Sequence, residues 1–393
     1  MTVAEQRRAT RSVSGEDEVL GKLSTLDRFL PLWIGLAMAA GLALGAIVPT
    51  LNDGLDRLRI GTVSLPIALG LLLMMYPVLA KVRYEELGRK QTDGVSGRRF
   101  FGISLFLSWV VGPLFMFALA WLFLADQPEY RTGVIIVGLA RCIAMVLIWN
   151  DLARGDRDRT AMLVLFNAVF QIAAYSLLGY FYLTVFPGWL GLDTAGFEVG
   201  IWEVARTVLI FLGIPLAAGY LTRRIALERK GRAWYDERFL PRIGPITLYG
   251  LLFTIILLFA IQGDTITSQP LDVALIAVPL LVYFAGMWVA GFAIGKLVGF
   301  PYPQTASMAF TVASNDFELA IAVSVGVFGA ASGQALAGVV GPLIEVPVLV
   351  SLVYVALWLR GRLTWPSPAL QDVDAAYIDT APPKDVGVRL PST

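Results

Sequence analysis

Three polar residues interrupt an apolar stretch in the second half of the sequence. In TVASNDFELAIAV, residues 311–323, Asn315, Asp316 and Glu318 stand where a membrane-spanning segment normally carries hydrocarbon side chains. An ionisable side chain at bilayer depth costs about 2.5–3.5 kcal/mol on insertion scales, so these two carboxyl groups are not expected to face lipid. Ser314 and Asn315 also compete for backbone hydrogen bonds, which favours a helix opened around a cavity. The pattern predicts the centre of a transport site.

A single cysteine is the second candidate for chemistry. Cys142 follows Arg141 within GLARCIAM, which also interrupts an apolar run. One cysteine excludes an intramolecular disulfide and a metal site built from several cysteines. Cys142 is therefore either a packed thiol or a ligand that offers one sulfur. The guanidinium of Arg141 would favour the reactive thiolate, provided that the two side chains meet.

A proton pathway in this protein must use carboxyl groups, water or the thiol, because the sequence contains no histidine. Few ionisable residues are predicted inside the membrane, and two arginines against three carboxyl groups leave one carboxyl to take a proton. The set is Arg141, Arg206, Asp316, Glu318 and Glu345. Glu318 is the predicted proton carrier, because it lies in the polar interruption. Glu345 is the competing candidate.

Two side-chain amides share one predicted helix face. Asn167 and Gln171 are four residues apart, which places them one turn from each other. They could line the transport cavity with neutral hydrogen-bonding groups, or they could bond a neighbouring helix. The sequence favours neither interpretation.

Composition and hydropathy place these residues in a multi-pass membrane protein. The chain of 393 residues is 57% hydrophobic and 16% charged, and its net charge of +1 gives no field that would attract nucleic acid. Since about 20 apolar residues cross a bilayer, the sequence predicts an all-α integral membrane protein with ten transmembrane helices. Their approximate limits are 29–50, 62–82, 100–124, 132–152, 160–187, 200–222, 243–262, 272–298, 303–328 and 335–360.

The predicted spans divide into two sets of five, residues 29–187 and 200–360. Because each set has an odd number of spans, the two sets are expected to have opposite orientations in the membrane, as inverted repeats. The interrupted fourth and ninth spans occupy matching positions, as expected for a site near the bilayer midplane. Of the 31 lysines and arginines, 26 fall on one side and three on the other, so both termini are expected in the cytoplasm. Residues 1–28 and 361–393 are predicted cytoplasmic tails, the second of them disordered.

Three separated motifs carry a resemblance to a known family. They read GLARCIAMVLIWNDLARGD, ASNDFELAIAV and SGQALAGVVGPLIEVPVLV. The chain resembles, over residues 25–360, the arsenical-resistance-three family of arsenite permeases, within the bile acid/arsenite/riboflavin transporter superfamily. The resemblance implies export of arsenite, sometimes of antimonite, from the cytoplasm in exchange for protons.

The resemblance also implies roles for individual residues. Those implied to bind substrate are Cys142, as the arsenic ligand, Arg141, Asn167 and Phe310. Those implied to couple protons are Glu318 and Glu345, to which the neighbouring Asp316 is added here. One departure concerns Asp316, because many members of the family read NNFELA at this motif. A carboxyl group in place of the second asparagine changes the expected local proton count.

The sequence thus predicts an arsenite efflux permease of the cell membrane, not an enzyme. Its expected partners are arsenite, protons and the lipid bilayer, with no cofactor, no nucleic acid and no obligatory ATPase subunit. The main alternative is a sodium-coupled organic-anion symporter of the same fold, which has no need for the Arg141–Cys142 pair. A membrane-embedded sensor or enzyme is disfavoured, since the sequence shows no nucleotide or metal motif.

Overall fold

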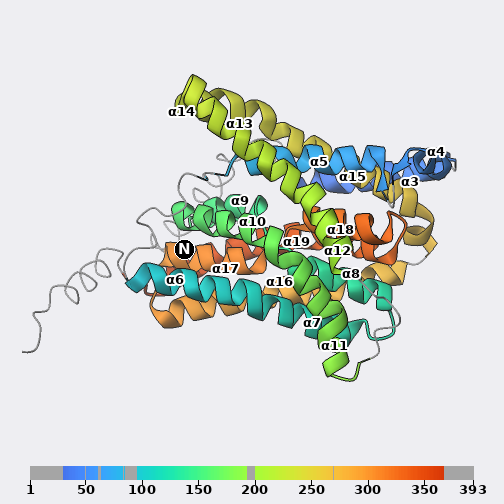
Figure 1. Ribbon diagram of the computed structural model, residues 1–393. Helices are drawn as coiled ribbons and strands as arrows, with labels where there is room; N and C mark the ends of the chain where they lie inside the picture. Colours follow the sequence, from blue (N-terminus) through green and yellow to red (C-terminus); the bar gives the residue numbers. More distant parts are fainter. Residues whose placement is uncertain are drawn as a thin grey trace, which may run out of the picture.

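A computed structural model describes residues 30–48, 50–60, 63–82, 84, 95–192, 200–268 and 270–366. Nearly all of this part of the chain is helical (Figure 1). One exception is a short antiparallel hairpin of β1 (Arg59–Ile60) and β2 (Val63–Ser64). The predicted tail 1–28 and most of the predicted tail 361–393 lie outside the described residues.

Six helical segments in the described part of the chain are long and apolar enough to cross a membrane. Each has 27 to 33 residues, more than the roughly 20 residues that a bilayer requires. They are Gly97–Phe123, Arg157–Trp189, Ile201–Lys230, Arg232–Gly263, Pro270–Val298 and Gly333–Arg362. Shorter apolar helices cover Leu32–Ile47, Leu65–Ala80 and Phe317–Phe328. The chain is therefore an all-α, multi-pass membrane protein.

Four of the long segments contain a π turn, and each π turn ends two residues before a proline. Proline lacks an N–H and crowds the carbonyl of the preceding turn, so the helix widens locally instead of keeping its α register. The prolines are Pro113, Pro187, Pro215 and Pro241. The segments run α6 (Val95–Phe106), η3 (Leu107–Val111) and α7 (Gly112–Phe123); α10 (Arg157–Tyr180), η4 (Phe181–Val185) and α11 (Phe186–Trp189); α12 (Ile201–Val208), η5 (Leu209–Gly213) and α13 (Ile214–Lys230); α14 (Arg232–Trp234), η6 (Tyr235–Phe239) and α15 (Leu240–Ser268).

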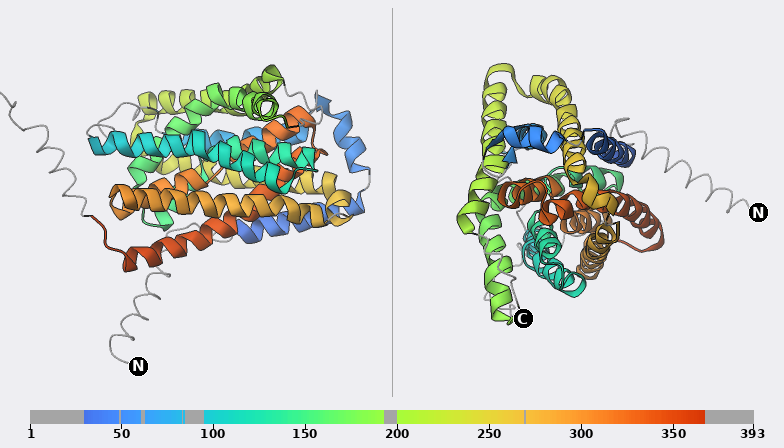
Figure 2. Two further views of the ribbon diagram at one scale, coloured as in Figure 1. Left: turned by 90° about the horizontal axis from the view of Figure 1, so that it is seen from below. Right: turned by 90° about the vertical axis from the view of Figure 1, so that its right-hand side faces the viewer.

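The helices form two packed groups. In the first, α15 lies against α3 (Leu30–Ile47) and α5 (Leu65–Ala80), and α5 also packs on α13. In the second, α16 (Pro270–Val298) and α19 (Gly333–Arg362) pack together, and α19 also contacts α8 (Pro128–Leu139) and α18 (Phe317–Phe328). Figure 1 shows the first group, with the short α4 (Leu51–Arg57), along the upper side of the molecule. The right-hand view of Figure 2 shows α5 and α15 above the orange and red helices of the second group.

Two helices of the second group are interrupted. The helix α8 (Pro128–Leu139) stops at Ala140, whose backbone is extended, and α9 (Met145–Leu152) begins after a non-helical stretch. The helix α17 (Tyr302–Ala313) stops at Ser314, which is also extended. Then α18 (Phe317–Phe328) begins with the Asp316 carboxylate accepting a hydrogen bond from the Leu319 N–H. Both interruptions fall on the polar motifs in which the sequence predicted them.

Candidate functional site

The two interruptions cross each other. Arg141 and Asn315 form an isolated antiparallel backbone bridge, in which each break supplies one short extended segment. The Cys142 N–H donates to the Ser314 carbonyl at 3.4 Å, and the Asp316 N–H donates to the Ala140 carbonyl at 3.1 Å. Backbone that leaves a helix at membrane depth must find partners inside the protein. The breaks meet this requirement by bonding each other.

The crossing places the sulfur of Cys142, the only cysteine in the sequence, at the amino end of α9. The Val146 N–H donates to Cys142 Sγ at 3.3 Å, and the Cys142 side chain is 2% exposed. The first turn of a helix carries partial positive charge, which stabilises negative charge on the sulfur, whereas burial opposes it. The sulfur is thus buried at the start of a helix and accepts one backbone N–H.

Three carboxyl groups lie in this region, and all are buried. Glu345 comes from α19, and its Oε1 accepts a hydrogen bond of 2.6 Å from Ser314 Oγ. Asp316 caps α18 through the Leu319 N–H, at 2.9 Å, and Glu318 lies two residues later in the first turn of the same helix. Two buried carboxyl groups this near in the chain cannot both carry charge at low cost. The predicted proton-coupling residues thus come together at one crossing.

The Arg141 guanidinium does not point at the thiol or form an ion pair among the described residues. Its Nη1 donates to the Tyr283 hydroxyl of α16 at 2.8 Å, and its Nη2 donates to the Gly138 carbonyl. Arg141 is fully buried, and its Nε has no hydrogen-bond partner in the described part of the chain. The positive charge is therefore held in place by neutral groups.

Arg206, the second arginine predicted inside the membrane, is not part of this cluster. Its side chain is exposed on α12, and Thr207 beside it is the residue that packs inward against Gly326 of α18. The predicted balance of two arginines against three carboxyl groups is therefore wrong. In the buried cluster one arginine stands against three carboxyl groups, which leaves more than one of them to be neutralised by protons.

The two amides of α10 hold the backbone of the first break. Gln171 Oε1 accepts a hydrogen bond from the Arg141 N–H at 2.7 Å, and Asn167 Nδ2 donates to the Cys142 carbonyl at 3.3 Å. Of the two interpretations left open by the sequence, bonding to a neighbouring segment is the one observed. The amides fix where Arg141 and Cys142 lie.

Phe310 lies one turn before the second break. Its carbonyl accepts a hydrogen bond from the Ser314 N–H at 3.1 Å, and its side chain is fully buried. The ring packs edge-on against Trp288 of α16, with 6.0 Å between ring centroids. Phe310 thus supplies an apolar wall next to the polar crossing.

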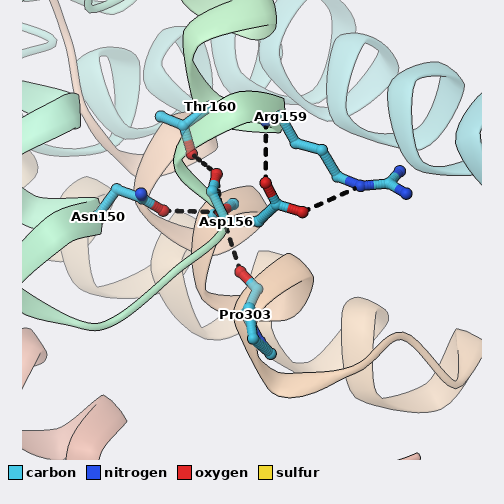
Figure 3. A network of polar contacts seen from close by, with 6 residues as sticks. Asn150, Asp156, Arg159, Thr160 and Pro303 are labelled. Carbon is cyan, nitrogen blue, oxygen red and sulfur yellow. Dashed lines mark hydrogen bonds and ion pairs between the residues drawn. The ribbon is translucent and has the colours of Figure 1, made fainter. Parts of the chain in front are cut away.

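A second polar network joins the two broken helices, where α9 ends and α17 begins (Figure 3). Asp156 donates its backbone N–H to the Pro303 carbonyl at 3.0 Å, and its carboxylate pairs with Arg159 at 3.2 Å. Ser307 of α17 bonds Asn150 of α9 at 2.7 Å. This network bonds α9 to α17 at the end of the pair whose flanking sequence is rich in lysine and arginine.

Comparison with known proteins decides the family. The chain is 56% identical over 349 residues to the arsenical-resistance protein Acr3 of Corynebacterium glutamicum, covering 89% of this chain and 93% of that protein. The chain belongs to the Acr3 family of arsenical-resistance transporters. The Acr3 protein of Alkaliphilus metalliredigens is 30% identical over 342 residues, 84% of this chain and 92% of that protein. An uncharacterized transporter of Synechocystis is 35% identical over 352 residues, 85% and 88% of the two chains.

A broader family pattern matches one part of this Acr3-family chain. Residues 68–269 match the Sodium Bile acid symporter family. The matched part contains the first break, with Arg141 and Cys142, and it ends before the second break. Membership of the Acr3 family rests on the relatives that cover most of the chain. The family consists of transporters and not of enzymes.

Two residues of the site were not singled out from the sequence. Tyr283 holds Arg141, and Trp109 bonds Asn167. Ser314, which bonds Glu345, lies in the polar motif that the sequence marked. Tyr283 and Trp109 are aromatic residues on apolar helices, and nothing in their sequence neighbourhood distinguishes them from residues that face lipid.

Proposed function

We propose that this transporter exports arsenite from the cytoplasm in exchange for protons. The observation that carries the proposal is the position of Cys142, the only cysteine of an Acr3-family chain, at the crossing of two broken helices beside three buried carboxyl groups. Trivalent arsenic is thiophilic, and in neutral water it is mainly the uncharged arsenous acid. A buried thiol in a polar crossing suits that solute.

One thiol binds arsenous acid by exchanging a hydroxyl group. The sulfur bonds arsenic, the arsenic–hydroxide bond breaks, and the thiol proton leaves with the hydroxide as water. The reverse reaction, with water as the attacking group, releases the substrate. A single sulfur permits this reversal, whereas three thiolates would hold arsenic too tightly for turnover. Antimonite has the same chemistry and is proposed as a second substrate.

Export of a neutral solute against its gradient needs a coupled ion. One proton that enters through 100 mV supplies about 2.3 kcal/mol, enough for a gradient of roughly 50-fold. Glu318 is proposed as the carrier of that proton, with Asp316 sharing it and Glu345 as the competing site. The burial of both carboxyl groups, two residues apart at the start of α18, supports a pair that exchanges protons as the site changes exposure.

The remaining site residues are proposed to shape the substrate position. Arg141 balances part of the carboxyl charge, so that the neutral substrate is not displaced by cations. Asn167 sets the position of Cys142 through its carbonyl. Phe310 limits the space available beside the crossing, since it is fully buried and packed on Trp288.

The proposed topology has ten membrane crossings. Residues 29–187 and 200–360 form two inverted repeats of five spans, and both termini lie in the cytoplasm of a cell-membrane protein, with residues 1–28 and 361–393 as cytoplasmic tails. The antiparallel crossing of α8–α9 with α17–α18 supports this arrangement, since inverted repeats place such breaks face to face. The excess of lysine and arginine in the inner segments supports the orientation.

A sodium-coupled organic-anion symporter is the alternative, favoured by the match of residues 68–269 to the Sodium Bile acid symporter family. Everted membrane vesicles separate the two functions. Arsenite should accumulate when a pH gradient is imposed in sodium-free buffer, and a sodium gradient alone should give no accumulation. Accumulation that requires sodium, or that ignores the pH gradient, would refute proton exchange.

A further inference from the structure

We propose that Trp109 is a positioning residue, which acts through Asn167 on the backbone that carries Cys142. The inference rests on the proposed role of Cys142 as the arsenic ligand. It adds the segment α6–η3–α7 to the site, because Trp109 belongs to the π turn η3.

Hydrogen bonds connect these residues in series. The Trp109 indole N–H donates to Asn167 Oδ1 at 3.2 Å, and Asn167 Nδ2 donates to the Cys142 carbonyl at 3.3 Å. Asn167 is 1% exposed and Trp109 is 8% exposed, so water does not compete with either bond. The series ends at the backbone carbonyl of Cys142, the residue that carries the sulfur.

The indole decides which way the Asn167 amide faces. A side-chain amide has an oxygen that only accepts and a nitrogen that only donates. With its oxygen held by Trp109, the amide must present its nitrogen to the Cys142 carbonyl. If the indole N–H were missing, Asn167 Oδ1 would be buried without this donor, and the bond to the Cys142 carbonyl alone would hold the amide in this direction. The indole N–H thus fixes the second end of the amide.

The π turn gives Trp109 this position. The widened turn ends two residues before Pro113, and the Trp109 ring packs edge-on against Phe170 of α10, with 4.5 Å between ring centroids. Packing with Phe170 and bonding to Asn167 use different parts of the indole. Replacing Trp109 by phenylalanine therefore removes the N–H while an aromatic ring remains against α10.

The test uses the reactivity of Cys142, which is the only cysteine in the chain. Alkylation by N-ethylmaleimide then reports one site, and arsenite that binds the sulfur slows it. The measured quantity is the arsenite concentration that halves the alkylation rate in full-length protein. Trp109→Phe should raise it about tenfold, the effect of leaving one buried polar group unpaired.

A double-mutant cycle distinguishes action through Asn167 from general loosening. Asn167→Leu should raise the half-protecting concentration at least as much as Trp109→Phe, and the double variant should not exceed Asn167→Leu. A Trp109→Phe value within twofold of the wild type, or effects that multiply in the double variant, would overturn the inference. Trp149→Phe is the control, since that buried indole N–H has no hydrogen-bond partner among the residues that the structure describes, and it should match the wild type.

Asn167→Asp keeps the test decisive if Trp109→Phe fails to accumulate. It retains the oxygen that accepts from Trp109 and loses the donor to Cys142, so it should shift protection as Asn167→Leu does. Wild-type protection in Asn167→Asp would overturn the inference. If arsenite does not protect the wild type at all, the proposed ligand role of Cys142 fails instead, and the two failures are thus distinguishable.

Discussion

Arg141 and Asn315 face each other across an antiparallel backbone bridge, although they belong to different broken helices. Cys142 follows the first of these residues, and Asp316 follows the second. The candidate substrate ligand and two of the candidate proton carriers, Asp316 and Glu318, therefore belong to two broken helices that bond each other directly. A shift of either broken helix changes the surroundings of both groups, which is the structural requirement for coupling substrate to protons.

Space for the Arg141–Tyr283 pair depends on Gly112. A Cβ atom at this position would lie 2.8 Å from Arg141 Nη1 and 3.0 Å from the Tyr283 hydroxyl. Gly112→Ala should therefore displace the guanidinium and lower arsenite transport about tenfold, the effect of overpacking a buried site. Gly102→Ala is the matched control on the same helical segment, because nothing lies within 4 Å of a Cβ atom added at Gly102. Equal transport by both variants would show that the position of Arg141 is not important.

The identity of the proton carrier is tested by neutral replacements. Glu318→Gln mimics a permanently protonated group of the same shape, so it should lose transport driven by a pH gradient while arsenite still protects Cys142 from alkylation. Glu345→Gln, compared at matched membrane expression, should retain more gradient-driven transport. Robust transport by Glu318→Gln together with loss in Glu345→Gln would move the proton site to α19.

Asp316 departs from the pattern of the family, and its effect is expected on the pH dependence of transport. Asp316→Asn removes a buried carboxyl group two residues before Glu318. Without a second negative charge beside it, Glu318 ionises more easily, so the pH profile of transport should move to lower pH. The measurement is the initial rate of arsenite transport against pH. A profile that coincides with the wild type would mean that Asp316 is neutralised by another group.

The orientation of the chain is tested by reporter fusions. Fusions at Gly54, Asp193 and Gly263 should report the outside of the cell, and fusions at Gly231 and the carboxyl terminus should report the cytoplasm. Asp193 lies outside the described residues, between the two proposed repeats. A cytoplasmic Asp193 would rule out the inverted-repeat arrangement, because that loop separates the two halves.

The sequence predicts the broken helices well because polar residues are costly at membrane depth. Ser314, Asn315 and Asp316 mark the second break, and the structure interrupts the helix at these residues. The bridge between Arg141 and Asn315 could not be predicted, since it depends on how two distant segments pack. The exposed position of Arg206 was missed for the same reason. A span contains both inward and outward positions, and hydropathy alone does not separate them.

The π turns were open to partial prediction. Each of the four ends two residues before a proline, such as Pro113 or Pro215. Other prolines inside helices, including Pro77 and Pro279, are not preceded by a π turn in the described structure. A proline within an apolar segment therefore indicates a local adjustment of the helix, while the surrounding packing decides its form. The role of Trp109 depends on that form.

Coupling itself is the central claim, and one measurement tests it directly. Purified protein in sodium-free proteoliposomes is given an arsenite gradient with no pH gradient, and the internal pH is followed. The account predicts proton flow opposite to arsenite flow in the wild type and none in Cys142→Ser, which keeps the size of the side chain and removes the arsenic ligand. Arsenite flow without proton flow in the wild type, or wild-type coupling in Cys142→Ser, would contradict the account.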